Sequence, residues 1–395
     1  MNKDIYFMPL GGGQSVGASC YYLRLGESNI ILDAGTGKKK GLEFEPDFYP
    51  LLTSSFMQSA NQINQVFISH AHMDHIGYLL KLMAQAKCAN VYMTEMTKVL
   101  AEFQLYDRIY INKEKDEYAR LAAKSLMEKI ITVSYMQKID CGNYKATFFN
   151  AGHIPGAMMV LMEMGKKKIL YTGDYSIEST VLTSKCMIPH NMEIDVLIMC
   201  GLHAKNSDYT NKSDSLQKKA YSVLKTIIQY EQPALCHVSQ LSKGIEFLHN
   251  AGCSYCIEFL KCINNLNDFG IPIYVDESVM NVVSKMEKLH IPILNEYNKI
   301  MTDEVILKPH IYLTSNKNKY RYRNYNEINI DFSLHEDFLG MKEFIKTINP
   351  KSAVVVHCAK EGESRYNTTI EQEIMLDGEC RTQFIFAEEN EIYKL

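Results

Sequence analysis

A run of metal-binding residue types directly after an apolar strand constrains this chain more than any other feature. The segment "FISHAHMDHIG", residues 67–77, places three histidines and an aspartate within six positions, although the 395 residues contain only 12 histidines. Residues two apart at a strand end project in one direction, so His70 and His72 are expected to bind one cation. The chain then turns into a helix, which lets Asp74 and His75 face a second position. Imidazole and carboxylate are ligands that zinc accepts.

Two metal ions need more ligands than this segment holds, and other strand ends supply them. His153 follows an apolar run in "NAGHIPGA", Asp174 follows one in "YTGDYS", and His357 ends one in "AVVVHCAKEGE". Each is a weak signal alone, because polar loop residues often follow strands. Asp33 in "IILDAG" is expected to orient the ligands through hydrogen bonds, and a turn-forming aspartate is the alternative.

Short β-branched and aromatic runs predict a strand-rich first half. The expected strands are residues 4–10, 20–25, 29–35, 65–70, 144–153, 157–164, 167–176 and 195–200. Helical spacing follows at residues 76–86, and two surface helices are expected in the region up to about residue 138. The glycines of "PLGGGQSVGAS" do not fit a phosphate loop, because a strand follows where that motif needs a helix, so a hairpin with close backbone contacts is expected.

From about residue 203 helices alternate with strands, which is typical of an α/β domain with parallel strands. This pattern ends near "HIYLTS", and a further helix, a strand and a strand-rich tail follow. At 395 residues the chain exceeds the usual size of one domain, so two domains are expected.

Composition narrows the function classes. The formal net charge of −4 argues against a globally basic nucleic-acid binder, but it leaves room for a local basic groove. The sequence contains no run of about 18 apolar residues that would predict a membrane span, and its start does not resemble a signal peptide, so a cytoplasmic protein is expected. The 11 cysteines are expected to be mostly core residues. The one C-x-x-C, Cys253 to Cys256 with Cys262 nearby, is interpreted as structural in preference to a zinc knuckle.

The series "LDAG", "HAHMDH", "AGHIPGA" and "TGDYS" resembles the metallo-β-lactamase superfamily, whose fold is an αββα sandwich with the metals at one edge. The added "FSLHEDF" and "VVVH" resemble the last two motifs of its β-CASP branch, which contains ribonucleases and DNA-processing nucleases. The resemblance implies a sandwich of residues 1–204 and 333–395, with a reduced α/β cap inserted at 205–332.

The resemblance also implies a reaction and its residues. Two zinc ions per chain would activate water for attack on a phosphorus. His70, His72 and His153 would hold one ion, Asp74, His75 and His357 the other, and Asp174 would bridge both. His335 in "FSLHEDF" would donate a proton to the leaving oxygen, and the alternative is a residue beside a helix cap with no chemistry.

The chain departs from the branch at two places. Cys200 stands where the branch usually carries an acidic residue, so His335 is expected to lack its charged partner. In the cap, only "VSQLSKGIEFL", with Lys243 and Glu246, loosely matches a known element. The resemblance therefore supports the metal chemistry more firmly than it identifies the substrate.

One segment bears on the substrate. "NKNKYRYRNY", residues 316–325, alternates cations with tyrosines just before His335. In an extended strand the cations would contact phosphates and the rings would stack on bases, whereas a solvated edge strand is the alternative. The predicted substrate-binding residues are Lys317, Lys319, Tyr320, Arg321, Tyr322 and Arg323.

The leading hypothesis is a zinc phosphodiesterase that cleaves nucleic acid in the cleft between the two domains. RNA is favoured over DNA because DNA-directed members of the branch tend to lack a histidine at the position of His357. A hydrolase of a small ester, thioester or cyclic nucleotide is the second hypothesis, and a non-catalytic scaffold subunit is the third. The oligomeric state stays open, with a homodimer as one option.

Overall fold

The computed structural model describes residues 4–111, 117–189, 192–207, 222–227, 229–230, 232–238, 241, 243–252, 271–291, 293–294, 298–300, 309–314, 325–329, 334–358, 369–378 and 381–395. The chain divides into two compact units. The first comprises Met1–Ser179, Thr183–Thr210 and His335–Leu395, and the second comprises Thr180–Leu182 and Asn211–Leu334. The domain boundaries expected from the sequence, after residues 204 and 332, stay predictions.

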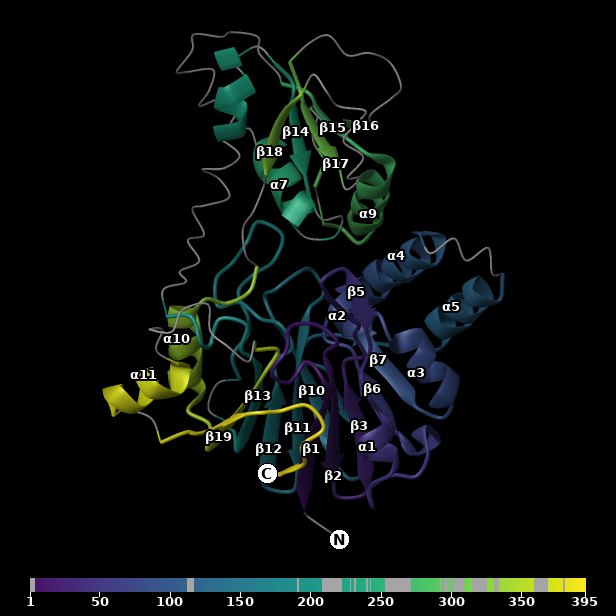
Figure 1. Ribbon diagram of the computed structural model, residues 1–395, viewed down its shortest axis with the longest axis vertical. Coiled ribbons are helices and arrows are strands. Elements are labelled where there is room, and N and C mark those ends of the chain that lie inside the picture. Colours follow the sequence, from purple (N-terminus) through teal and green to yellow (C-terminus); the bar gives the residue numbers. More distant parts are fainter. Residues whose placement is uncertain are drawn as a thin grey trace. The chain divides into compact units, whose positions relative to one another are not determined.

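A seven-stranded mixed sheet forms one half of the first unit (Figure 1). Its strands in spatial order are β21 (Tyr393–Lys394), β1 (Ile5–Gly11), β2 (Cys20–Leu25), β3 (Ser28–Leu32), β6 (Gln65–Phe67), β7 (Asn90–Thr94) and β8 (Ile131–Val133). Strands β1 to β3 are antiparallel, whereas β3, β6, β7 and β8 are parallel. The first four predicted strands are confirmed, and β7 and β8 are strands that the sequence patterns did not predict.

A second seven-stranded sheet forms the other half. Its strands in spatial order are β20 (Gln383–Phe386), β19 (Ser352–Val356), β13 (Val196–Cys200), β12 (Lys167–Tyr171), β11 (Met158–Met164), β10 (Lys145–Asn150) and β9 (Lys138–Asp140). Strands β9 to β12 are antiparallel, and β12, β13, β19 and β20 are parallel. The chain therefore returns after the second unit to add β19 between β13 and β20.

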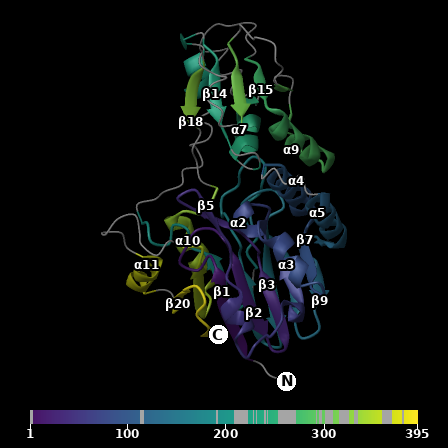
Figure 2. The same cartoon turned by 45° about the vertical axis from the view of Figure 1, so that its right-hand side comes forward.

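The two sheets pack face to face, because one apolar cluster draws side chains from both. Its buried members include Phe7, Leu23, Phe67, Phe148, Val160, Ile198 and Val354. Helices α3 (Leu79–Gln85), α4 (Glu95–Ile111) and α5 (Glu117–Lys129) lie beside the β7 end of the first sheet, and α10 (Phe338–Ile348) and α11 (Ile370–Asp377) lie on the side of β19 (Figures 1 and 2). This arrangement is the αββα sandwich that the motifs predict.

Five parallel strands form the sheet of the second unit. They are, in spatial order, β16 (Asn298–Ile300), β15 (Ile273–Val275), β17 (Ile311–Thr314), β14 (Ala234–His237) and β18 (Asn326–Asn329). Helices α7 (Lys243–Gly252) and α9 (Glu277–Lys288) alternate with the strands. Asp276 caps α9 by accepting from Val279 N–H at 2.9 Å, and Val279, Val283 and Met286 bury one face of the helix. The predicted α/β domain with parallel strands is confirmed.

The glycine-rich loop joins β1 to β2 as a hairpin, as predicted. Gly12 has a positive φ of 67°, and a Cβ there would lie 2.9 Å from the Cα of Ser19, so the backbones approach too closely for a side chain. No helix among the described residues is long and apolar enough to cross a membrane. Cys253, Cys256 and Cys262 lie outside the described residues.

Candidate metal centre

The predicted ligands follow strands that lie parallel to one another. His70 follows β6, and Asp33 follows β3, the parallel neighbour of β6. Asp174 and His357 follow β12 and β19, which flank β13 in parallel. Because the carboxyl ends of parallel strands meet at one edge, Asp33 and His70 lie at one edge of the first sheet, and Asp174 and His357 lie at one edge of the second. The other predicted ligands are His72, after β6, Asp74 and His75 in α2 (Met73–Ile76), and His153, after β10.

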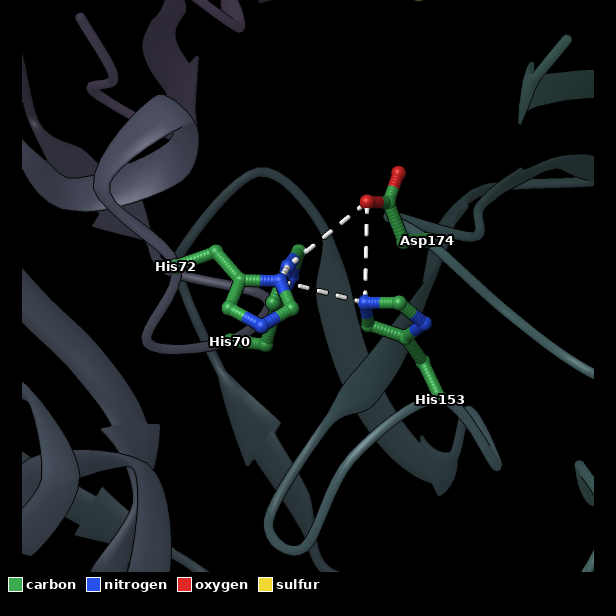
Figure 3. A group of neighbouring side chains, drawn as sticks. All are labelled: His70, His72, His153 and Asp174. Carbon is green, nitrogen blue, oxygen red and sulfur yellow. Dashed lines mark hydrogen bonds and ion pairs between the residues drawn. The ribbon is translucent and has the colours of Figure 1, made fainter. Parts of the chain in front are cut away.

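Four of these side chains form a first group (Figure 3). His72 Nδ1 lies 3.0 Å from His70 Nε2 and 3.2 Å from His153 Nε2. Asp174 Oδ2 lies 3.7 Å from His70 Nε2 and 3.8 Å from His153 Nε2. The four ligand-type atoms all lie within 4.8 Å of one another, so they are close enough to share one cation.

Asp74, His75 and His357 form a second group. The Oδ2 atom of Asp74 lies 4.0 Å from His75 Nε2 and 3.7 Å from His357 Nε2. Asp174 also faces this group, since its Oδ2 lies 3.4 Å from His75 Nε2 and its Oδ1 lies 3.2 Å from His357 Nδ1. Asp174 therefore lies between the two groups, in a position compatible with the bridging role that the resemblance implies.

Asp33 is fully buried behind His75. Its Oδ2 accepts from His75 Nδ1 at 2.7 Å, from Ser69 Oγ at 2.7 Å and from the Tyr171 hydroxyl at 2.5 Å, and its Oδ1 accepts from Ser69 N–H at 2.6 Å. A proton held on Nδ1 leaves the lone pair of His75 Nε2 directed at the two groups. Asp33 also has a positive φ of 60°, so it turns the chain and orients a ligand at once.

His335 lies against the first group. Its Nδ1 is 3.4 Å from Asp174 Oδ2, and its ring centroid is 4.8 Å from that of His153. Cys200, buried at the end of β13, joins Asp174 and His335 in a third set whose ligand-type atoms lie within 4.8 Å of one another. The expectation that His335 lacks a charged partner is therefore incomplete, because Asp174 faces it. The sequence could not show this contact, since the two residues are 161 positions apart.

Burial and charge divide the imidazoles into two classes. Burial, with neighbouring imidazoles, lowers the pKa of His72 to about 4 and holds the pKa of His70 well below its usual value. Burial also acts to lower the pKa of His357, but Asp174 raises it to about 9. Asp174 likewise raises the pKa of His75 well above its usual value, against the effect of burial. The pKa values of His75 and His357 are thus raised because both rings face the buried carboxylate of Asp174.

The donor set fits metal ions. Asp174 Oδ2 and His357 Nε2 are buried and form no hydrogen bond with the described residues. Tetrahedral zinc with bonds of about 2.0–2.1 Å holds neighbouring ligand atoms roughly 3.4 Å apart. The separations between facing ligand atoms in the first group run from 3.0 to 3.8 Å. A cation would replace the protons of His75 and His357 as the charge opposite Asp174.

Glu336 is a residue at the site that the sequence argument missed. Its Oε2 accepts from Ile177 N–H at 2.5 Å, which connects the segment after Asp174 to the neighbour of His335. Burial raises the pKa of Glu336 to about 7. The acidic pair in "FSLHEDF" was the available signal, but only the structure separates Glu336 from Asp337, whose side chain caps α10.

The predicted substrate-binding residues are not among those the structure describes. These are Lys317, Lys319, Tyr320, Arg321, Tyr322 and Arg323. Their role stays a prediction.

Known proteins support the motif assignment. Residues 14–197 match the family model of the metallo-beta-lactamase superfamily. The chain belongs to the metallo-β-lactamase superfamily. It is 30% identical over 301 residues to Cleavage and polyadenylation specificity factor 73 of Drosophila melanogaster, which covers 73% of this chain and 40% of the relative. It is also 30% identical over 283 residues to Probable RNase MJ4 of Methanocaldococcus jannaschii, which covers 70% of this chain and 60% of the relative.

These relatives confirm the predicted β-CASP branch of this superfamily. The chain spans about half the length of the curated relatives it matches. A crystal structure of a protein of unknown function from Enterococcus faecalis V583 has the same fold, with a TM-score of 0.63. That match covers 99% of this chain and 100% of the other at 14% identity.

Proposed function

We propose that this protein is a dinuclear zinc phosphodiesterase that hydrolyses nucleic acid, with RNA as the favoured substrate. The observation that carries the proposal is the pair of ligand groups on either side of Asp174. A superfamily member with this donor set is suited to metal-dependent hydrolysis. The names of the relatives, which include Probable RNase MJ4 and Endoribonuclease YSH1, favour RNA.

In this proposal six side chains hold the two ions in groups of three, and Asp174 is shared. The groups are His70, His72 and His153 for one ion and Asp74, His75 and His357 for the other. Zinc bound there would lower the pKa of water to around 7 and stabilise the charge on phosphoryl oxygens.

The chain's own residues have three further roles. Asp33 fixes the tautomer of His75 through the 2.7 Å hydrogen bond to Nδ1. His335 is proposed to hydrogen-bond the leaving oxygen and to give it a proton, because it borders the first group while 22% of its side chain stays exposed. Glu336 is a positioning residue that ties the Asp174 loop to the start of α10.

The proposed phosphate and base contacts come from the cationic and aromatic segment at residues 317–323. RNA is preferred over DNA because His357 is present. The cytoplasm is the proposed location, and the described cysteines, which are all free, agree with a reducing compartment.

The test is to incubate the zinc-loaded protein with labelled single-stranded RNA, single-stranded DNA, cyclic AMP, a thioester and bis(p-nitrophenyl) phosphate. RNA cleavage is expected to exceed DNA cleavage and to disappear in Asp74→Ala. Since the Asp74 side chain is 33% exposed, its loss should leave the fold intact, which circular dichroism checks. Cleavage of the thioester alone would favour the small-ester hypothesis, and RNA binding without any hydrolysis would favour a scaffold. Wild-type turnover in Asp74→Ala would refute the two-metal mechanism.

A further inference from the structure

A pocket in the first unit is lined in part by Asp74, a proposed metal ligand. Its volume is about 660 Å³, which is within the roughly 300–1,000 Å³ range of small-molecule sites. Its walls come from the loop before β2, from the hairpin of β4 (Gly37–Lys39) and β5 (Leu42–Phe44), and from α4. No role proposed above uses this space.

Arg108 forms the cationic wall, and it is held in place by other residues. Its Nη1 donates to Thr36 Oγ1 at 3.0 Å, and its Nη2 donates to Glu43 Oε2 at 2.8 Å. A Cβ added at Gly77 would lie 2.8 Å from Arg108 Nη1, so the guanidinium fits against a backbone without a side chain. Two of its five N–H groups are thus used among the described residues, and the head group is oriented before any ligand arrives.

The other walls supply complementary chemistry. Lys38 is exposed on β4 and forms no ion pair with the described residues. Val16 and Met73 give an apolar surface, and Gln104, one helical turn from Arg108, offers an amide donor and acceptor. Glu43 is paired with Arg108 and Asp74 is a proposed metal ligand, so Lys38 supplies the positive charge that suits an anion joined to a flat, partly apolar group.

We infer that this pocket binds a nucleotide next to the phosphodiester being cleaved, and the inference rests on the proposed function. Arg108 and Lys38 contact the nucleotide's phosphate, because a guanidinium and an ammonium are strong phosphate donors. The base lies against Val16 and Met73, and Gln104 hydrogen-bonds its edge. The first unit then contributes a specificity site of its own.

The test is a calorimetric titration of AMP, and separately of inorganic phosphate, into the zinc-loaded protein. AMP should bind at least tenfold more tightly than phosphate, because only AMP reaches the apolar wall. Lys38→Gln should weaken AMP binding at least fivefold. Lys39→Gln is the matched control, since it removes the same charge from the adjacent position of β4 but does not line the pocket, and it should change binding less than twofold.

Arg108→Lys keeps the charge but loses the guanidinium fork that contacts the phosphate, so the affinities for AMP and for inorganic phosphate should both fall, the affinity for AMP by about tenfold. Thermal melting checks that Arg108→Lys folds. If it does not fold, Lys38→Gln still tests the inference, because Lys38 is exposed and its replacement should leave the fold intact. If AMP binds no better than phosphate, or the two lysine variants behave alike, the inference is overturned. RNA cleavage by the wild type reports on the proposed function separately, so selective AMP binding without RNA cleavage overturns only that function.

Discussion

Replacing Asp33 with asparagine tests whether this buried carboxylate sets the geometry of the metal centre. The change conserves volume, but it removes a charge that accepts four hydrogen bonds, three of them at Oδ2. In the better of its two orientations the amide oxygen replaces Oδ2, and its NH₂ group then faces the Ser69 N–H. In the other orientation the NH₂ group faces His75, Ser69 and Tyr171 together.

The expected loss of stability follows from these four hydrogen bonds. At least one buried donor loses its acceptor and three charge-assisted hydrogen bonds become neutral, so the free energy of unfolding should fall by about 3–5 kcal/mol. In the better orientation His75 Nδ1 keeps an acceptor, but a neutral amide replaces the carboxylate that fixes its tautomer. Mutating such an outer partner of a proposed metal ligand typically costs roughly 10–100-fold in metal affinity, and that loss is expected here.

Two measurements separate stability from metal binding. Urea unfolding of the metal-free protein gives the first, and zinc competition against a chromophoric chelator gives the second. Asp195→Asn is a matched control, because Asp195 is also buried and accepts from Lys168 N–H at 2.9 Å and from Lys351 Nζ at 2.7 Å, away from the ligand groups. The control should lose stability and keep its zinc affinity. A zinc affinity within twofold of wild type in Asp33→Asn would refute the orienting role.

Three further predictions follow from the same contacts. Zinc should bind more tightly as pH rises from 7 to 9, because the pKa of His357 is raised to about 9 and its proton must leave before the metal binds. A pH-independent affinity, with no proton release in buffers of different ionisation enthalpy, would contradict this. His335→Ala should slow cleavage of RNA at least tenfold more than cleavage of bis(p-nitrophenyl) phosphate, whose leaving group needs little protonation. Because burial holds the pKa of His335 well below its usual value, the rate of RNA cleavage by the wild type, relative to that of the aryl ester, should also fall as pH rises. Equal losses on both substrates would make His335 a positioning residue. In the second unit, burial raises the pKa of Glu246 to about 7, so the contribution of this side chain to stability is fully present below about pH 4.5 and is lost as pH rises through 7. Urea unfolding of the wild type should therefore show about 3 kcal/mol of pH dependence that Glu246→Gln lacks. Identical pH profiles of the two proteins would refute this.

The sequence predicted the architecture well where each element has its own periodic signal. Strands such as β2 and β3 contain aromatic or β-branched pairs, "YY" and "II", and are followed by the turn residues Gly26 and Asp33, so their positions could be predicted. β7 and β8 were missed because "NVYMT" and "ITV" are short and lie between helical segments. These strands are specified by pairing, of β7 with β6 and of β8 with β7, which is a tertiary effect.

The candidate site was predictable in its ligand types and less so in its contacts. His70, His153 and Asp174 each follow a strand; β10 and β12 are both antiparallel to β11, so His153 and Asp174 come to the same edge of the second sheet, whereas His70 comes from the first sheet and meets them only through the packing of the two sheets. The contact of Asp174 with His335 and the hydrogen bond of Glu336 to Ile177 depend on how loops far apart in sequence meet. For Asp33 the sequence offered a turn-forming role and an orienting role as alternatives. The structure shows both, because Asp33 has a positive φ and its carboxylate accepts from His75 Nδ1.

The glycine-rich loop shows how the scaffold and the centre depend on each other. His357 has a φ of 53°, a left-handed conformation that costs a non-glycine residue of order 1 kcal/mol or more, and such strain persists only where neighbours enforce it. Here the neighbours are the loop carbonyls, since His357 N–H donates to Gly12 O at 2.6 Å and Cys358 N–H donates to Gly13 O at 3.2 Å. A Cβ at Gly13 would lie 2.5 Å from the carbonyl oxygen of Ala387, so only glycine lets the loop approach this closely. The glycines that look like a phosphate loop in the sequence therefore act through the protein's own backbone, by holding the last proposed ligand in the orientation that faces Asp74 and Asp174.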